Sequence, residues 1–223
     1  TLVVEKDARR ALAKAVSIFM EKQPATIVAI TGTNGKTSVS TFCRQLWNAL
    51  GINGINIGTT GIEGSWSAPL NYTTPDPVKI HEVLSTAVSE GITHVAMEAS
   101  SHGLDQRRLD GVEIKAAAFT NFSRDHLDYH VSIEDYFNAK KGLFERLCPK
   151  GKVGVFNIDN KQIKNLCDWY ALNNEALTIG AGRPFQAGYE WTGRVAKVDV
   201  FNSALTAAQI KQNFNQQRSR FGV

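Results

Sequence analysis

The sequence has few cysteines, and they lie far apart. Cys43, Cys148 and Cys167 form no CxxC pair, so the sequence indicates neither a disulfide framework nor a zinc site, and buried or incidental thiols are expected. The chain also lacks an apolar run near the roughly 20 residues that span a bilayer. Residues 1–10 lack the apolar core of a signal peptide. These absences predict a cytoplasmic protein with no membrane partner.

Most of the chain carries no net positive charge. The 223 residues include 25 Lys and Arg against 21 Asp and Glu, and six of the basic but only two of the acidic residues lie in 183–223. Residues 1–182 are therefore neutral, with 19 of each sign. Phosphate backbones are bound by clusters or stripes of Lys and Arg. Because the sequence has no such stripe, we expect no nucleic-acid partner.

Apolar residues make up 43% of the chain, enough for a core. From Thr26 onward, short apolar runs alternate with segments in which apolar residues follow helical spacing, such as Val39, Phe42 and Leu46. Repeated strand, helix, strand units predict an α/β fold with a doubly wound, mostly parallel sheet. Residues 58–77 are interpreted as a loop. The predicted strands are 27–30, 55–57, 94–97, 115–120, 152–158 and 176–179, and the predicted helices are 7–20, 37–50, 77–90, 132–147 and 161–172.

The strongest functional signal is the segment Thr31–Thr37, which joins a predicted buried strand to a helix. Glycines let backbone N–H groups point toward a phosphate, a lysine reaches the β- and γ-phosphates, a threonine hydroxyl binds Mg²⁺, and a helix N-terminus favours an anion. The general spacing GxxxxGK[ST] is not met, because Ile30 stands six residues before Lys36. The segment is therefore a variant P-loop, with a plain Gly-rich turn as the alternative. Its predicted nucleotide-binding residues are Gly32, Thr33, Asn34, Gly35, Lys36, Thr37 and Ser38.

Polar residues also follow two other predicted strands. Glu98 stands at a strand end, where open α/β sheets bind ligands, and could hold the Mg²⁺; a solvated carboxylate is an equal alternative. The segment Asn121–His130 is rich in His and carboxylates, which suits metal binding or acid–base chemistry, although such runs are often polar loops. Lys140, on the next predicted helix, would by default be a surface lysine.

Together these segments resemble the Mur ligases. The resemblance covers residues 3–182, and it is strongest to the family members that add the third amino acid to UDP-N-acetylmuramoyl-L-alanyl-D-glutamate. Folylpolyglutamate synthetases have a similar phosphate loop, but the segments 72–75 and 100–103 favour the Mur branch. Five motifs occur in the family's order and spacing: Thr31–Thr37, Asn71–Pro77, Met97–Arg108, Asn121–His130 and Tyr136–Lys140.

The resemblance implies a chemistry and a role for each matching residue. In this family ATP converts a substrate carboxylate to an acyl phosphate, which an amine then attacks. By resemblance, Thr37 and Glu98 hold one Mg²⁺, His126 binds a second, and Lys140 matches a carbamylated lysine whose anionic carbamate positions that second ion. Lys36, Glu98, His126 and Lys140 are then the predicted catalytic residues, and Asn121 joins the ATP-binding set. The predicted contacts to the UDP-muramoyl-dipeptide are Thr73, Thr74, Ser100, Gln106 and Arg108.

The sequence departs from complete members of the family at both ends. Their N-terminal domain grips the uridine nucleotide and their C-terminal domain carries the amino-acid site, and 223 residues leave no room for either. We therefore expect a central ATP-binding domain over residues 1–182 and an appended tail over 183–223, with a strand at 194–201 and a helix at 207–216. The tail resembles the end of a laminin-G-like jelly roll or, alternatively, the segment that closes the Mur central domain. It is expected to pack against the sheet's edge.

Two functional hypotheses follow. In the first, the chain is the ATP- and Mg²⁺-binding module of a peptidoglycan-precursor ligase, which activates the D-Glu carboxylate of UDP-MurNAc-L-Ala-D-Glu and does not complete ligation alone. In the second, it is a non-catalytic truncated or fusion protein that folds and binds at most a nucleotide.

Overall fold

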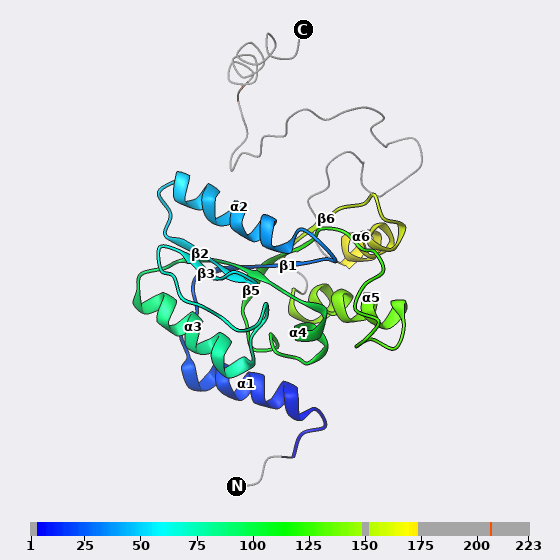
Figure 1. The fold of residues 1–223 in the computed structure, drawn as a ribbon, viewed down its shortest axis with the longest axis horizontal. Helices are drawn as coiled ribbons and strands as arrows, with labels where there is room; N and C mark the ends of the chain where they lie inside the picture. Colours follow the sequence, from blue (N-terminus) through cyan, green and yellow to red (C-terminus); the bar gives the residue numbers. More distant parts are fainter. Residues whose placement is uncertain (1–3, 149–151, 174–205, 207–223) are drawn as a thin grey trace.

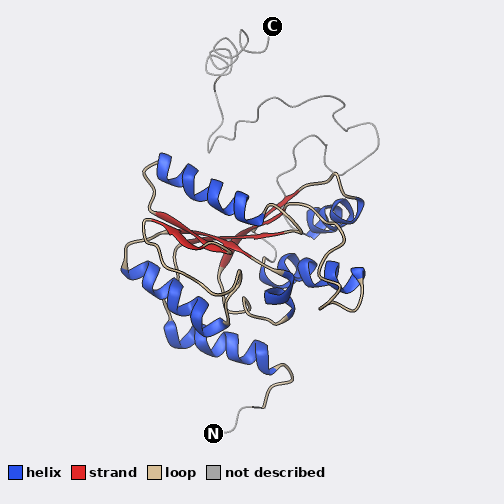
Figure 2. Cartoon of the chain, in the orientation of Figure 1, coloured by secondary structure: helices blue, strands red, loops and turns tan. Residues whose placement is uncertain are grey.

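A six-stranded sheet forms the centre of the molecule, with helices on both faces (Figures 1 and 2). The computed structural model describes residues 4–148, 152–173 and 206, so the predicted strands at 176–179 and 194–201 and the predicted helix at 207–216 lie outside the described residues. The strands are β1 (Thr26–Thr31), β2 (Gly54–Gly58), β3 (Gly61–Gly64), β4 (His94–Glu98), β5 (Ile114–Phe119) and β6 (Val153–Phe156).

The strand order is β3-β2-β4-β1-β5-β6, and every neighbouring pair is parallel except β2 and β3. This confirms the predicted α/β fold with a mostly parallel sheet. The interpretation of 58–77 as an uninterrupted loop was wrong, because β3 forms an antiparallel hairpin with β2 there. The helices are α1 (Ala8–Met20), α2 (Lys36–Ala49), α3 (Pro77–Ser89), α4 (Ser101–Asp105), α5 (Ile133–Gly142), the π-helical segment η1 (Leu143–Leu147) and α6 (Lys161–Asn173).

Short polar side chains cap the N-termini of four of these helices, and in α4 the Ser100 hydroxyl accepts a hydrogen bond from the backbone N–H of Gly103. The Asp7 carboxylate accepts a hydrogen bond from the backbone N–H of Arg10, and the Asp76 carboxylate accepts one from that of Lys79. The Ser132 hydroxyl accepts a hydrogen bond from the backbone N–H of Asp135. Each of these bonds satisfies a backbone donor that the first turn of a helix leaves free.

The direction of each connection decides which face of the sheet its helix covers. From β1 the chain moves through α2 to β2, toward the β3 edge, whereas the connections through α3, α4 and α5 move toward β6. Crossovers between parallel strands are right-handed. The helix α2 therefore lies on one face, and α3, α4 and α5 lie on the other (Figure 1).

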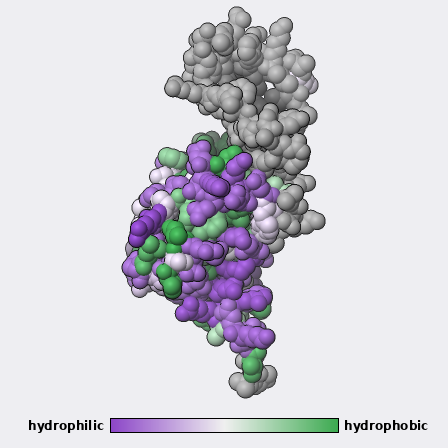
Figure 3. All heavy atoms as spheres, turned by 90° about the vertical axis from the view of Figure 1, so that its right-hand side faces the viewer, coloured by the Kyte–Doolittle hydropathy of each residue, from purple (hydrophilic) through white to green (hydrophobic). Residues whose placement is uncertain are grey.

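The apolar pattern of α2 predicted a helix correctly but not its buried side. Phe42 and Leu46 are 59% and 65% exposed, whereas Ser40 is fully buried. The helix instead contacts the sheet on the side of Trp47, whose ring lies 5.1 Å from that of His94 of β4. Seen from the β6 side, apolar residues likewise appear among hydrophilic ones on the surface (Figure 3).

The core lies between the sheet and its helices and is built from the central strands. Ile27, Ala29, Val95 and Met97 are at most 1% exposed, as expected for strands covered on both faces. Cys148 and Cys167 are buried, as expected from the sequence, whereas Cys43 is partly exposed. None of the helices in the described part of the chain has the length and apolar character that a membrane crossing requires.

One buried side chain in this core, His81 of α3, makes stability depend on pH. His81 is fully buried, and neither ring nitrogen has a hydrogen-bond partner. Burial lowers the pKa of His81, because the charged imidazolium would lose its water. The unfolded chain takes up a proton near pH 6.5, which the folded chain resists. We therefore expect the free energy of unfolding to fall as the pH drops below about 6.5.

A His81→Leu variant should lose part of this slope when urea unfolding is measured at pH 7.5 and 5.5. The comparison variant is His94→Leu, which should lose less of the slope: burial also lowers the pKa of His94, but His94 is only half-buried. A His81→Leu curve parallel to that of the parent would contradict the prediction.

Candidate nucleotide-binding site

A cavity of about 450 Å³ lies at the carboxyl ends of the central strands. The strands β1 and β4 are neighbours, yet their following helices, α2 and α4, lie on opposite faces of the sheet. Open α/β sheets bind ligands in the crevice that such a switch point creates. Most of the predicted site residues line this cavity: Thr33, Asn34, Gly35, Lys36, Thr37, Thr73, Thr74, Glu98, Ser100, Arg108, His126 and Lys140.

Two glycines shape the loop that enters the cavity from β1. Gly32 has φ +146°, and a Cβ there would overlap the Thr120 hydroxyl. Gly35 has φ +82° and precedes the first residue of α2. Side chains are disfavoured at both positions. The loop can therefore turn into the helix while its backbone stays close to the strand β5 side of the cavity.

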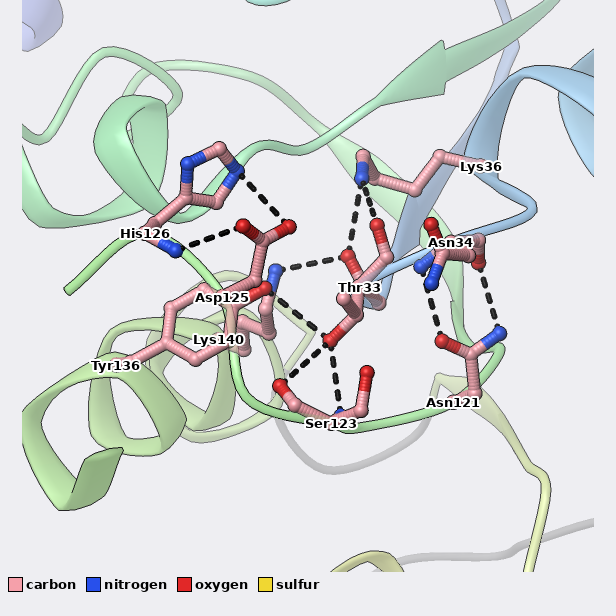
Figure 4. A network of polar contacts seen from close by, with 10 residues as sticks. Thr33, Asn34, Lys36, Asn121, Ser123, Asp125, His126, Tyr136 and Lys140 are labelled. Atoms are coloured by element: carbon pink, nitrogen blue, oxygen red, sulfur yellow. Dashed lines mark hydrogen bonds and ion pairs between the residues drawn. The ribbon is translucent and has the colours of Figure 1, made fainter.

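A pair of amide side-chain contacts holds the tip of this loop (Figure 4). The backbone N–H of Asn34 donates to Asn121 Oδ1, and Asn121 Nδ2 donates to the Asn34 carbonyl, both at 2.9 Å. Asn121 is not among the residues that line the cavity. In this structure it therefore fixes the loop, and its predicted contact with ATP stays a prediction, as does that of the exposed Ser38.

Two lysines meet at one carbonyl group beneath the loop. Lys36 Nζ donates to the Gly32 and Thr33 carbonyls at 3.0 and 2.9 Å, and Lys140 Nζ donates to the same Gly32 carbonyl at 2.8 Å. Lys140 is 1% exposed, so the default expectation of a surface lysine was wrong. Burial and repulsion from Lys36 lower the pKa of Lys140 to about 7. Attraction from Asp125 opposes this shift in part. The Lys140 ammonium therefore gives up its proton much more readily than that of an exposed lysine.

The helix α5 is tied to the phosphate loop through Tyr136. Lys140 Nζ lies 4.5 Å from the centre of the Tyr136 ring, at a distance typical of a cation–π contact. The Tyr136 hydroxyl donates to Thr33 Oγ1 at 3.2 Å, and Thr33 Oγ1 also accepts from the Ser123 backbone N–H at 3.0 Å (Figure 4). Three segments distant in sequence are therefore fixed around Thr33.

The oxygens of Thr37 and Glu98 suit a magnesium ion. Thr37 Oγ1 lies 2.9 Å from Glu98 Oε1, and Glu98 is only 1% exposed. Hydroxyl and carboxylate oxygens are ligands that Mg²⁺ prefers, usually together with water and phosphate oxygens. The pair stands at the N-terminus of α2, where a phosphate is expected. These residues therefore fit the predicted ion.

The second predicted metal position is less complete. His126 and Lys140 line the same cavity, and His126 Nε2 lies 3.7 Å from Asp125 Oδ2. Within the described ranges, no three His, Cys, Asp or Glu side chains are grouped so that they could hold a metal. A second ion would therefore need ligands of another kind, such as the predicted Lys140 carbamate or phosphate oxygens.

Hydrogen bonds join the predicted substrate residues to Glu98. Thr74 Oγ1 donates to the Glu98 carbonyl at 2.9 Å and accepts from the Ser100 backbone N–H at 3.0 Å. Arg108 Nη1 donates to the Thr74 carbonyl at 2.6 Å. Gln106 does not line the cavity; its Oε1 accepts from Arg108 Nε and Nη2. In this structure Gln106 therefore orients the guanidinium group.

The cavity is also lined by Thr59, Tyr72, Ser101 and His102, none of which was among the predicted site residues. Of these, Thr59 has a direct contact with Glu98. Thr59 lies in the turn between β2 and β3, and its backbone N–H donates to Glu98 Oε1 at 2.9 Å. The signal that could have identified it is its place directly after Gly58, at the carboxyl end of a parallel strand.

The sheet order, the glycine-containing loop and the cavity at the switch point define a doubly wound domain of the α/β class. A family model, the Mur ligase middle domain, matches residues 30–216, and the chain belongs to the Mur ligase family. The UDP-N-acetylmuramoyl-L-alanyl-D-glutamate–2,6-diaminopimelate ligases of Brucella melitensis and Rhizobium meliloti are each 54% identical to it over 156 residues. These alignments cover 70% of this chain and 32% of each relative. The chain thus spans about a third of the length of the curated relatives it matches.

Solved structures agree with this placement. A structure of a UDP-N-acetylmuramoyl-L-alanyl-D-glutamate–2,6-diaminopimelate ligase superposes with a TM-score of 0.68 and 33% identity, covering 79% of this chain and 37% of that one. Escherichia coli FolC in complex with ADP superposes with a TM-score of 0.58 over 80% of this chain and 48% of that one. At 14% identity, the second likeness concerns the fold alone.

Proposed function

We propose that this chain is the ATP-binding module of a peptidoglycan-precursor ligase, which activates the D-Glu carboxylate of UDP-MurNAc-L-Ala-D-Glu as an acyl phosphate. The observation that carries the proposal is the meeting of two residue sets in one cavity. Lys36, Thr37 and Glu98 form the phosphate and metal side, and Thr74 and Arg108 form the other side. The two 54% identical relatives are ligases named for this substrate, which supports the assignment.

Each side of the cavity has its own task in this reaction. Lys36, together with the backbone N–H groups at the start of α2, binds and orients the ATP phosphates. Thr37 and Glu98 would hold Mg²⁺, which would supply charge neutralisation at the transferred phosphoryl group. Arg108, oriented by Gln106, pairs with an anionic group of the substrate.

The acyl phosphate would then be attacked by the amine of the incoming amino acid, with loss of phosphate and formation of an amide bond. We propose that the residues of this cavity carry out the activation step, and that ligation also draws on the parts of the relatives that the alignment does not cover. A soluble, cytoplasmic setting follows from this role, since ATP and nucleotide-linked precursors are consumed there.

The test is calorimetric titration of the chain with ATP in the presence of Mg²⁺. We expect binding that EDTA weakens, because Thr37 and Glu98 act through the ion. Addition of amino acid alone should release no ADP. Absence of binding would contradict the proposal, and formation of tripeptide product by this chain alone would contradict the assignment as a module.

The non-catalytic alternative differs at the next step. A module that activates its substrate should form a hydroxamate when UDP-MurNAc-dipeptide, Mg·ATP and hydroxylamine are supplied together, because hydroxylamine traps acyl phosphates. A protein that only binds nucleotide forms none. A folylpolyglutamate synthetase-like activity is less well supported, since the likeness to FolC is one of fold alone.

A further inference from the structure

Three hydrogen-bond donors contact the Glu98 carboxylate, and Thr59 supplies two of them. Its backbone N–H donates to Glu98 Oε1 at 2.9 Å, and its hydroxyl lies 3.4 Å from Glu98 Oε2. The third donor is the Thr37 hydroxyl, also on Oε1. Both oxygens of the carboxylate thus accept a hydrogen bond, and among the described residues the one to Oε2 comes from Thr59.

The backbone of the same turn also limits where the carboxylate can lie. A Cβ at Gly58 would overlap the Glu98 carboxylate, so the side chain of Glu98 rests directly on the strand β2. With 1% of its surface exposed, Glu98 has little water to compete for its oxygens. Its orientation is therefore set by the hairpin of β2 and β3 as well as by the phosphate loop.

A third hydroxyl extends this arrangement to the substrate side. The Thr59 and Thr73 hydroxyls lie 3.0 Å apart, and a hydroxyl has a single proton to donate. When Thr59 gives its proton to Glu98 Oε2, Thr73 must be the donor to Thr59. The bonds then run in one direction, from Thr73 through Thr59 to the carboxylate.

We propose that Thr59 is a positioning residue, which orients the Glu98 carboxylate for a divalent cation and connects it to Thr73. The proposal rests on the proposed function only in taking Glu98 as a ligand of the ion. Groups that orient metal ligands commonly contribute about 10- to 100-fold to metal affinity. The backbone N–H bond survives a side-chain change, so we expect the lower end of this range.

The experiment measures binding of Mn²⁺, without nucleotide, from the electron paramagnetic resonance signal of the free ion. The full chain is compared with Thr59→Val, which keeps the shape of the side chain and loses the hydroxyl. We expect Mn²⁺ affinity to fall about tenfold. Thr59→Ser should restore it. The matched control is Thr60→Val, in the other residue of the turn, and it should bind Mn²⁺ like the parent.

A second comparison tests the link to the substrate side. Thr73→Val should weaken Mn²⁺ binding less than Thr59→Val does, and it should add nothing in the double variant, because residues of one network are not additive. Urea unfolding of each variant separates a loss of metal binding from a loss of fold.

Three results would overturn the proposal. These are parental Mn²⁺ affinity in Thr59→Val, equal losses in Thr59→Val, Thr59→Ser and Thr60→Val, and no Mn²⁺ binding by the parent. Failure of the proposed function looks different, because it appears as absent ATP binding while the pattern among the Thr59 variants persists.

Discussion

Replacing Lys36 with alanine is expected to remove most of the affinity for Mg·ATP. Hydrogen bonds to the Gly32 and Thr33 carbonyls hold the Lys36 ammonium at the N-terminus of α2. The lysine side chain therefore loses little conformational freedom when a phosphate binds. A hydrogen bond to a charged group is worth about 1.5–3 kcal/mol. Its loss corresponds to a decrease of about 10- to 100-fold in affinity, measured by calorimetric titration.

The matched control for this variant is Lys79→Ala. Lys79 is an exposed lysine on α3 that pairs with Glu82, away from the cavity. The Lys79→Ala variant should bind Mg·ATP like the parent, since surface changes have small effects. Urea unfolding of Lys36→Ala checks that its loss of affinity is not a loss of fold. If Lys36→Ala binds as tightly as Lys79→Ala, the phosphate loop does not act as described.

The second large effect is expected at Lys140, as a reaction with dissolved carbon dioxide. The neutral amine attacks the carbon of CO₂ and loses a proton, which leaves an N-carboxylate anion. Because the pKa of Lys140 is lowered to about 7, the reactive form increases as the pH rises from 6 to 8. An exposed lysine with a pKa near 10.4 stays protonated over this range.

Carbon NMR with ¹³C-labelled CO₂ at fixed concentration should therefore show a carbamate signal that grows from pH 6 to 8. Lys140→Met should lack it. The matched control is Lys141→Met, because Lys141 is less buried and pairs with Glu145. Lys36→Ala should move the profile to higher pH, since repulsion from Lys36 helps to lower the pKa of Lys140. A signal that survives in Lys140→Met would refute the assignment.

The parallel sheet was predictable because its central strands are marked by local sequence. The run Ile27–Ile30 is continuously apolar, and it lies between β4 and β5 with both faces covered. By contrast, β3 consists of Gly-Ile-Glu-Gly. This strand forms because it pairs with β2. Its own sequence has neither an apolar run nor a clear apolar–polar alternation from which a strand could be predicted.

The site was predictable in part for a similar reason. Glycines and Lys36, placed between a predicted buried strand and a helix, indicated a variant phosphate loop although the general spacing is not met. The burial of Lys140 is different, because it depends on the Gly32 carbonyl, 108 residues away in the sequence. Thr59 was missed because its partner Glu98 is 39 residues away, and a threonine in a turn carries no local sign of such a contact.

The strand order also has a consequence for how the molecule folds. The central strand β1 pairs with β4 and β5, which follow it by more than 60 residues, so the centre of the sheet closes only after long chain loops have been ordered. Contacts of this range slow folding. The cavity, which draws on the ends of these strands, can therefore exist only late in the process. A nucleotide that binds this cavity would therefore not accelerate collapse or early strand pairing, because the cavity does not yet exist at those stages. It would stabilise the completed sheet and slow its unfolding.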